Sequence, residues 1–343
     1  MKKTFQPAWR LLGMLALALA STSASAQQGN GETVRIQSFP GGSNIHAVIA
    51  NAKGFCAKRN IKCEIRNIAS APLAAQALMG KSVDVINTSI DLVVANVAAG
   101  ADLVIIATDA PNQIFTITHR PDMSGPNQAA GYPAMVRDWK GMRIGVGARG
   151  GASEVIFNLM LKDAGLQPSD VTFVGVGGPS THYSALVNKQ IDVSVTFPPM
   201  GQMCAHMKGC VVALDTAKGE GPAVLRSMAG ANFPYASRRE WVDNNPKLAQ
   251  AYLATMLEAD AWLKDPKNFA ELESIYEPLL DFGPHIPEPR VLRRTILQDS
   301  VARRTNQLKT DRAAVVASIE FTAANKLSNG PVDAKRLVWD QAP

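Results

Sequence analysis

Apolar and polar positions follow a regular order over the first two thirds of the chain. Short runs rich in β-branched residues, such as 33–39 and 142–146, are followed by glycines and then by a stretch whose apolar residues have helical spacing, as at 153–165. That stretch ends in Gly165, which is typical of a helix terminus. The order predicts an α/β fold of mainly parallel sheets with helices on both faces.

The same order occurs twice at a fixed interval. Arg35 and Arg143 lie in equivalent predicted strands (143 minus 35 is 108), and Asp84 and Asp192 keep the same interval (192 minus 84 is 108). Two further pairs of predicted strands keep nearly this offset. Four shared positions indicate a duplicated unit of strand, loop and helix.

The N-terminal segment has the pattern of a secretory signal peptide. Three basic residues precede and flank a ten-residue apolar core at 11–20, and small residues up to Ala26 provide a cleavage site. The apolar core is too short to span a bilayer, and no cysteine near the cleavage site offers a lipid anchor. We expect residues 1–26 to be removed on export.

The charge of the exported chain argues against nucleic acid as a partner. The sequence has 35 basic and 29 acidic residues, and the signal peptide contains three of the basic ones and no acid. The remaining 32 against 29 give a net charge of only +3. Nucleic-acid-binding domains are usually strongly basic on one face, so no such partner is expected.

The duplication and the length that remains after residues 1–26 predict two lobes, because one compact core rarely holds so long a chain. We expect a first lobe at 27–115, a second at 116–226, and a return to the first lobe with C-terminal helices at 227–343. Residues 114–121 and 226–237 follow the last strand of each copy. They are expected to cross between the lobes and to act as hinges.

The last long helical pattern carries several arginines. They are expected to form a solvated face, and the alternative is a surface that docks a membrane partner. These residues are Arg290, Arg293, Arg294, Arg303 and Arg304.

Four cysteines lie in the exported part, at Cys56, Cys63, Cys204 and Cys210. An oxidising compartment favours disulfides, and each close pair spans a predicted helix end and the next strand. We therefore predict the pairs Cys56–Cys63 and Cys204–Cys210, each contributing about 2.5 kcal/mol by restricting the unfolded chain. A zinc site is the alternative, but the tight C-x-x-C spacing of such sites is missing.

Residues 145–150 spell G-x-G-x-x-G, the pattern of a dinucleotide-binding turn. A predicted strand precedes it and a predicted helix follows. The next strand, at 171–178, ends in glycines and lacks the acid that holds a ribose hydroxyl. We therefore expect no NAD and no other cofactor, and instead an anion at the helix N-terminus, where the helix dipole favours negative charge.

Four segments, taken in order, resemble a known family. They are DWKGMRIGV at 138–146, NKQIDVSVTFPP at 188–199, VDNNPKLAQAYLATML at 242–257 and NKLSNGPVDAKRLVWD at 325–340. The chain resembles the nitrate/sulfonate/taurine-type substrate-binding proteins of ABC importers, which are related to those that bind the pyrimidine precursor of thiamine. The resemblance implies a two-lobed periplasmic binding protein with a ligand cleft between the lobes. It also implies a periplasmic monomer that delivers its ligand to an inner-membrane permease and its ATPase.

The loops at the strand ends are expected to contact the ligand. Arg149 is expected to bind a carboxylate or sulfonate, and the glycines beside it allow close approach to backbone N–H groups. The expected ligand-binding residues are Phe39, Ser43, Asn44, Thr88, Ser89, Asn112, Arg149, Gly150, Gly151, Ala152, Ser153, Gly178, Ser180, Thr196, Phe197 and Asn232.

The expected ligand is a small organic anion, a sulfonate or a carboxylate, and a neutral heterocycle stays open as an alternative. No acid stands out in the sequence as a partner for a cationic amine. His46 and His182 begin corresponding helices and are candidates to face the ligand, but the five histidines form no catalytic set or metal site. We therefore expect a binding protein. The alternatives are an enzyme of the same fold that acts on a small heterocycle, similar to the pyrimidine synthases, and a ligand-sensing module.

Overall fold

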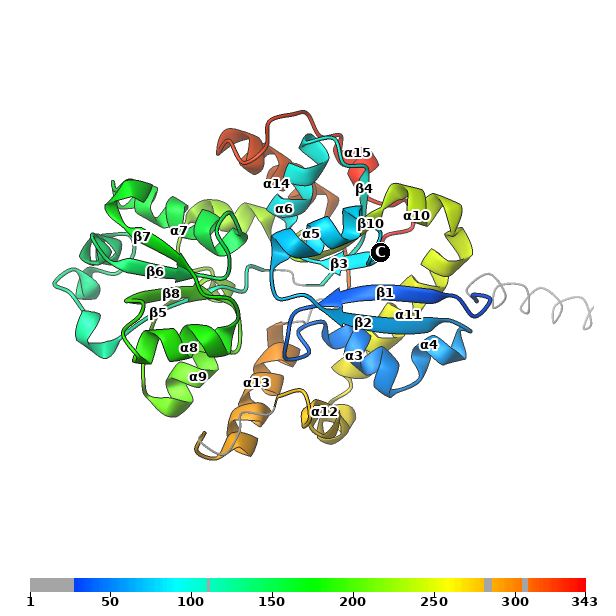
Figure 1. The fold of residues 1–343 in the computed structure, drawn as a ribbon, viewed down its shortest axis with the longest axis horizontal. Coiled ribbons are helices and arrows are strands. Elements are labelled where there is room, and N and C mark those ends of the chain that lie inside the picture. The colour runs from blue at the N-terminus through cyan, green and yellow to red at the C-terminus, as the bar shows by residue number, and fades with distance from the viewer. Residues whose placement is uncertain (1–27, 110–111, 281–285, 304–307) are drawn as a thin grey trace, which may run out of the picture.

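The computed structural model describes residues 28–109, 112–280, 286–303 and 308–343. The predicted signal peptide at 1–26 lies outside these residues. The described chain forms two five-stranded sheets side by side, each flanked by helices (Figure 1). The predicted fold class, two α/β lobes, is confirmed.

The first sheet has the strand order β2-β1-β3-β10-β4. Its strands are β1 (Thr33–Ser38), β2 (Lys62–Asn67), β3 (Val85–Asn87), β4 (Leu103–Thr108) and β10 (Pro234–Arg238). The helices that connect them are α3 (Ile45–Ala52), α4 (Phe55–Lys58), α5 (Ala71–Met79) and α6 (Ile90–Ala98).

The second sheet repeats this plan with the order β7-β6-β8-β5-β9. Its strands are β5 (Thr116–His119), β6 (Arg143–Val146), β7 (Thr172–Gly175), β8 (Val193–Thr196) and β9 (Val211–Asp215). Its main helices are α7 (Ala152–Asp163), α8 (Pro179–Val187) and α9 (Met200–Met207). The repeated order is the structural counterpart of the fixed interval in the sequence.

One antiparallel strand in each sheet comes from a segment that crosses between the lobes. β5 follows β4 in the chain but lies between β8 and β9 of the second sheet, antiparallel to β8 and to β9. β10 follows β9 but lies between β3 and β4 of the first sheet, antiparallel to both. The predicted crossings at 114–121 and 226–237 therefore contain β5 and most of β10, and the sheets are mixed. The lobe boundaries at 115 and 226 stay a prediction.

Apolar side chains fill both faces of each sheet. Around the first sheet, one cluster packs α3 and α11 (Pro246–Lys264) on one face, and another packs α5, α6 and α14 (Arg312–Ala324) on the other. In the second lobe the rings of Trp139 and Phe157 stack at 5.9 Å between their centres. A smaller cluster lies under α8 and α9. Burial on both faces explains why the strands read as apolar runs in the sequence.

The C-terminal third is helical, as predicted. It also contains α10 (Arg239–Asn244), α12 (Phe269–Tyr276), α13 (Pro289–Arg303) and α15 (Ala334–Leu337). Helix α13 lies below the gap between the two sheets and close to α9 in Figure 1. Among the residues described, no helix combines the length and the apolar character needed to cross a membrane.

Both predicted disulfides are present. Cys56 of α4 is bonded to Cys63 of β2, and Cys204 of α9 is bonded to Cys210 just before β9. Each joins a helix to the strand that follows it, as the sequence predicts, so the zinc alternative is wrong. No group of three or more metal-ligating side chains occurs in the described part of the chain.

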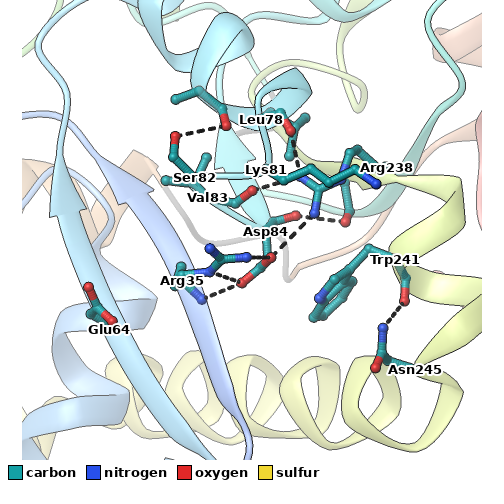
Figure 2. Close-up of polar contacts among 12 residues, drawn as sticks. Arg35, Glu64, Leu78, Lys81, Ser82, Val83, Asp84, Arg238, Trp241 and Asn245 are labelled. Atoms are coloured by element: carbon teal, nitrogen blue, oxygen red, sulfur yellow. Dashed lines mark hydrogen bonds and ion pairs between the residues drawn. The ribbon is translucent and has the colours of Figure 1, made fainter.

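One buried carboxylate is shared by two arginines at the amino edge of the first sheet. Asp84, whose side chain is 2% exposed, precedes β3 and accepts hydrogen bonds from Arg35 Nε and Nη2 at 2.8 and 2.6 Å and from the Arg35 backbone N–H at 2.9 Å. Arg238, at the end of the crossing strand β10, donates to Asp84 at 3.3 Å and to the carbonyl oxygens of Leu78 and Val83. Figure 2 shows the two arginines reaching Asp84 from different strands. We call this set the Arg–Asp–Arg clamp.

The second sheet contains the same clamp at the equivalent positions. Asp192 accepts hydrogen bonds from Arg143 Nε and Nη2 at 3.0 and 2.8 Å and from Arg120 Nη1 at 2.6 Å. Arg120 follows the crossing strand β5, as Arg238 ends β10, and it also donates to the carbonyl of Ile191. The bonds donated by the Arg143 guanidinium hold the pKa of Asp192 well below its ordinary value of 3.8.

The clamp leads to a stability prediction. Asp84→Asn leaves Arg35 and the buried Arg238 without their counter-charge, so the free energy of unfolding should fall by about 3 kcal/mol, and Asp192→Asn should have a similar effect. Glu64→Gln is the control, because Glu64 pairs with a partly exposed Arg66 in the same sheet and is itself half exposed. Urea unfolding of the three variants measures the difference. An Asp84→Asn protein as stable as the Glu64→Gln protein would show that the clamp does not stabilise the fold.

His182 is fully buried in the second lobe and cannot face a ligand. Its Nδ1 lies 2.7 Å from the hydroxyl oxygen of Ser194 in β8. Burial lowers its pKa from 6.5 to about 4, because the charged imidazolium would lose its hydration. The neutral ring is therefore the form that fits the folded protein at neutral pH.

This burial predicts acid sensitivity in a defined pH range. Between pH 6.5 and about 4 the unfolded chain binds a proton at His182 that the folded protein does not, so unfolding becomes easier by up to about 3 kcal/mol as the pH falls. His182→Gln should remove this part of the pH dependence of the urea midpoint. The stabilisation from Asp192, whose folded pKa is also depressed, is present above pH 3.8 and is lost only as the pH falls below that value. The same slope in both proteins between pH 6.5 and 4 would contradict the assignment to His182.

Candidate ligand-binding cleft

A cavity of about 560 Å³ lies where the carboxyl edges of the two sheets face each other. The loops after β1, β2, β3 and β4 line it from the first lobe, and those after β6, β7 and β8 line it from the second. Residues of α13 and of the segment after α12 close a further side. Parallel α/β sheets bind their ligands outside the carboxyl ends of the strands, so this cavity is the candidate site.

Six helices begin at the wall of the cavity, because each follows one of these strand-end loops. They are α3, α5, α6, α7, α8 and α9. Asn44 caps α3 through a bond from the Ala47 N–H, whereas none of the other five has a side-chain cap. Uncapped amino ends present backbone N–H groups and the positive end of the helix dipole. These amino ends therefore provide hydrogen-bond donors at a cavity wall that is otherwise largely apolar.

Two threonine hydroxyls occupy matching places in the two lobes. Thr88 follows β3 and Thr196 ends β8, and the two positions keep the interval of the duplication (196 minus 88 is 108). Both residues are almost fully buried, both line the cavity, and neither hydroxyl oxygen has a hydrogen-bond partner. A buried hydroxyl without a partner is costly, and a bound molecule would satisfy it.

Two charged side chains line the cavity, Asp109 and Arg303, and neither was predicted there from the sequence. Asp109 follows β4, is buried, and lies 3.5 Å from His46 Nδ1, whose Nε2 lies 3.2 Å from Asp260. The expectation that no acid stands out was therefore wrong for Asp109, although its place directly after a strand end was a signal. His46 itself is buried and does not line the cavity.

Arg303 is the cationic side chain of the cavity wall. It donates to Asp215 of β9 at 3.0 Å and to Asp299 of its own helix at 2.5 Å. The solvated face expected for this arginine was wrong, because its side chain is only 17% exposed. Arg304 lies outside the described residues.

Helix α13 joins the two lobes beside the cavity. Besides the bond from Arg303 to Asp215, Gln202 of α9 donates to Asp299 at 2.7 Å. His206 Nε2 lies 2.5 Å from the carbonyl oxygen of Pro287. The rings of Phe39 and Phe197, which line the cavity from different lobes, have their centres 5.7 Å apart. The lobes therefore also touch at the cavity wall itself.

Most of the predicted contact residues line the cavity. Ser43 also bonds to the backbone of Phe39, and Ser153 accepts from the Gly147 N–H, so both hold their loops in shape. The predicted residues that line the cavity are Phe39, Ser43, Thr88, Ser89, Gly151, Ala152, Ser153, Gly178, Ser180, Thr196 and Phe197.

Arg149 and Gly150 lie outside the cavity wall. The Arg149 guanidinium donates to both oxygens of Glu154 at 2.8 and 3.1 Å, and the Gly150 N–H donates to the same carboxylate at 2.8 Å. The Arg149 side chain is 62% exposed. The chain's own Glu154 thus occupies the place where these two residues were expected to bind an anion.

Three other predicted residues also lie outside the wall. Asn44 caps α3 and accepts a bond from the Tyr235 hydroxyl. Asn232 accepts from Gln113 and donates to the Met228 carbonyl. Asn112 lines a separate, smaller surface pocket beside residues 216–220. None of these three amides therefore lines the cavity.

No histidine or cysteine of the described chain is among the residues that line the cavity. His46, His119 and His182 are buried elsewhere, and His206 lies beside the segment before α13. His285 lies outside the described residues. The lining residues carry hydroxyls, the amide of Asn87, aromatic and aliphatic side chains, one carboxylate (Asp109) and one guanidinium (Arg303).

Solved structures with the same fold include periplasmic binding proteins and an enzyme. The periplasmic aliphatic sulphonate binding protein SsuA from Escherichia coli is 20% identical, with a TM-score of 0.64 over 90% of this chain and 97% of that one. The periplasmic nitrate-binding protein NrtA from Synechocystis PCC 6803 is 16% identical, with a TM-score of 0.57 over 89% and 90%. The desulfurization enzyme DSZB is 14% identical, with a TM-score of 0.57 over 90% and 96%. At these identities the likeness shows the fold.

A search among curated protein sequences finds no match. The model of one protein family matches residues 27–276, which is most of the chain. The two lobes, the exchanged strands and the cleft at the strand ends are those of the periplasmic binding protein fold, as the resemblance implied. This protein belongs to the NMT1-like family.

Proposed function

We propose that this chain is a periplasmic solute-binding protein that captures a small organic anion and delivers it to an ABC permease. The observation that supports this most is the convergence of five uncapped helix amino ends and two unpartnered, buried threonine hydroxyls on one cavity. The names of the neighbours add support, since two of those compared are a sulphonate-binding and a nitrate-binding periplasmic protein.

Neutral donors, and not an arginine, are proposed to hold the negative group. Arg303 is already shared between Asp215 and Asp299, and Arg149 is bonded to Glu154 outside the cavity. Backbone N–H groups at helix amino ends bind sulfonates and carboxylates without a counter-charge. Thr88 and Thr196 would each add one O–H donor, which is stronger when its acceptor is ionised.

The cellular location, the partners and the oligomeric state of the protein are part of the same proposal. The predicted signal peptide and the periplasmic neighbours support export to the periplasm. A monomer, without a cofactor, would close on its ligand and present both lobes to the inner-membrane permease and its ATPase. A neutral heterocycle is the alternative ligand, and Asp109 would serve as the acceptor for one of its N–H groups.

An enzyme of the same fold is the second candidate, favoured only by the likeness to the desulfurization enzyme. The cavity wall argues against it, because the His182 and Ser194 pair is buried away from the cavity and no cysteine or histidine of the described residues lines it. Incubation separates the two: a binding protein returns the compound unchanged, whereas an enzyme converts it. A sensing module would bind the same ligand without supporting its uptake by the permease.

A pair of hydroxyl deletions tests the proposed site. A thermal-shift screen of sulfonates, carboxylates, nitrate and pyrimidines first identifies the tightest compound, which should be an organic anion. Thr88→Val and Thr196→Val keep the side-chain shape and remove one donor each, so calorimetry should show binding weakened about tenfold or more in either variant. Arg149→Ala is the control and should bind with unchanged affinity.

The opposite pattern would contradict the proposal. Full affinity in both threonine variants together with a loss in Arg149→Ala would move the anion out of the cavity to the loop at residues 145–150. Binding of NAD to the wild type would contradict the interpretation of that loop as well, because the strand after it lacks the ribose-binding acid.

A further inference from the structure

The C-terminal segment gives the cavity one apolar wall. Five residues line the cavity together: Tyr276 at the end of α12, Leu279 and Leu280 just after it, and Ile296 and Leu297 of α13. Four of them are buried, whereas Leu279 is 40% exposed. We call these five residues the C-terminal wall.

The C-terminal wall is fixed against the first lobe by a tight turn. The Tyr276 hydroxyl donates to the carbonyl oxygen of Gly42 at 2.6 Å. A Cβ atom on Gly42 would lie 3.0 Å from both Leu279 Cδ1 and Tyr276 Cε1, and the φ of +71° at this position also favours glycine. The glycine turn after β1 therefore allows the C-terminal wall to pack closely against the first lobe. The position of the wall in the cleft is thus fixed by specific contacts.

The proposed donors of the cavity lie on other elements, although Ser300 and Arg303 of α13 also line it. The threonine hydroxyls follow β3 and β8, and the uncapped helices begin at the loops of the two sheets, whereas the wall belongs to α12, the residues just after it, and α13. The cavity of about 560 Å³ falls in the range that holds drug-sized molecules. An inorganic anion or a two-carbon sulfonate would leave most of this volume, and the apolar wall, in contact with water.

We propose that the C-terminal wall makes the protein selective for amphipathic organic anions with an apolar body of about six carbons or more. This inference rests on the proposed function, because it concerns the same cleft. The negative group binds at the helix amino ends, and the apolar body packs on the wall. Burial of apolar surface then sets the affinity, and the five wall residues determine specificity.

A homologous series of ligands tests the wall. Linear carboxylates and sulfonates of two to eight carbons are titrated by calorimetry into the wild type. Each added methylene should tighten binding about fourfold until the wall is covered. Leu279→Asn should flatten this dependence and leave the shortest members unchanged, because Leu279 is half exposed and its replacement spares the core. Val316→Asn is the control and should behave as wild type, because Val316 is a similarly exposed residue of α14 and does not line the cavity.

The possible failures are distinct. If short and long members bind equally and Leu279→Asn binds like the wild type, the selectivity of the wall is overturned and the proposed anion-binding function stands. If no member of either series binds, the proposed function itself is overturned, and the inference with it.

Discussion

The arrangement of this protein depends on one carboxylate in each lobe that is shared by two arginines. Asp84 and Asp192 stand at the amino edges of the sheets and each binds one arginine from a parallel strand and one from the crossing strand. The desolvation cost of burying these charges is offset only because each carboxylate has several donors. The crossing strands β5 and β10, which belong to the other half of the chain, are thereby fixed in their sheets.

The carboxyl edges of the sheets are left for the ligand. With the amino edges closed by the clamps, the strand ends open into loops that begin helices, and six such loops meet at the cavity. The opposite ends of the crossing strands lie at the cavity, where Phe115 and Phe233 have ring centres 6.1 Å apart. Each lobe is braced by its clamp at the edge far from the cleft, and the crossing segments join the lobes near the cleft. The two lobes are therefore suited to move as rigid bodies about these crossing segments. Helix α13 contacts both lobes beside the cavity and contributes two residues of the C-terminal wall.

The fold followed from the sequence because its signals are local and repeated. The alternation of apolar runs with helical patterns, the fixed interval between the two copies and the cysteine spacing were sufficient to predict two lobes and both disulfides. The two crossings were predicted, but their pairing as antiparallel strands inside the sheets was not, because a four- or five-residue strand carries no sign of the neighbours it will pair with.

The site was predicted less completely, because side-chain partners come from distant parts of the chain. Thr88, Thr196 and the loop of Gly151 to Ser153 were found from their place after strands. Arg149 was expected in the cleft because a glycine-rich turn beside an arginine is typical of anion sites. Instead, the carboxylate of Glu154 in the first turn of α7 accepts the bonds from Arg149 and from the Gly150 N–H. The positions of the Arg303 and Asp109 side chains depend on contacts with Asp215 and His46 respectively. These partners lie far away along the chain, so no local sequence pattern predicts the pairs.

We expect the two internally braced lobes to close on a ligand at the cleft. Small-angle scattering of the wild type, with and without a saturating amount of the tightest-binding compound from the screen, measures this closure. The radius of gyration should be smaller in the presence of the compound, while far-ultraviolet circular dichroism shows unchanged secondary structure. An unchanged radius with the compound demonstrably bound, or a change in secondary structure on binding, would contradict this closure.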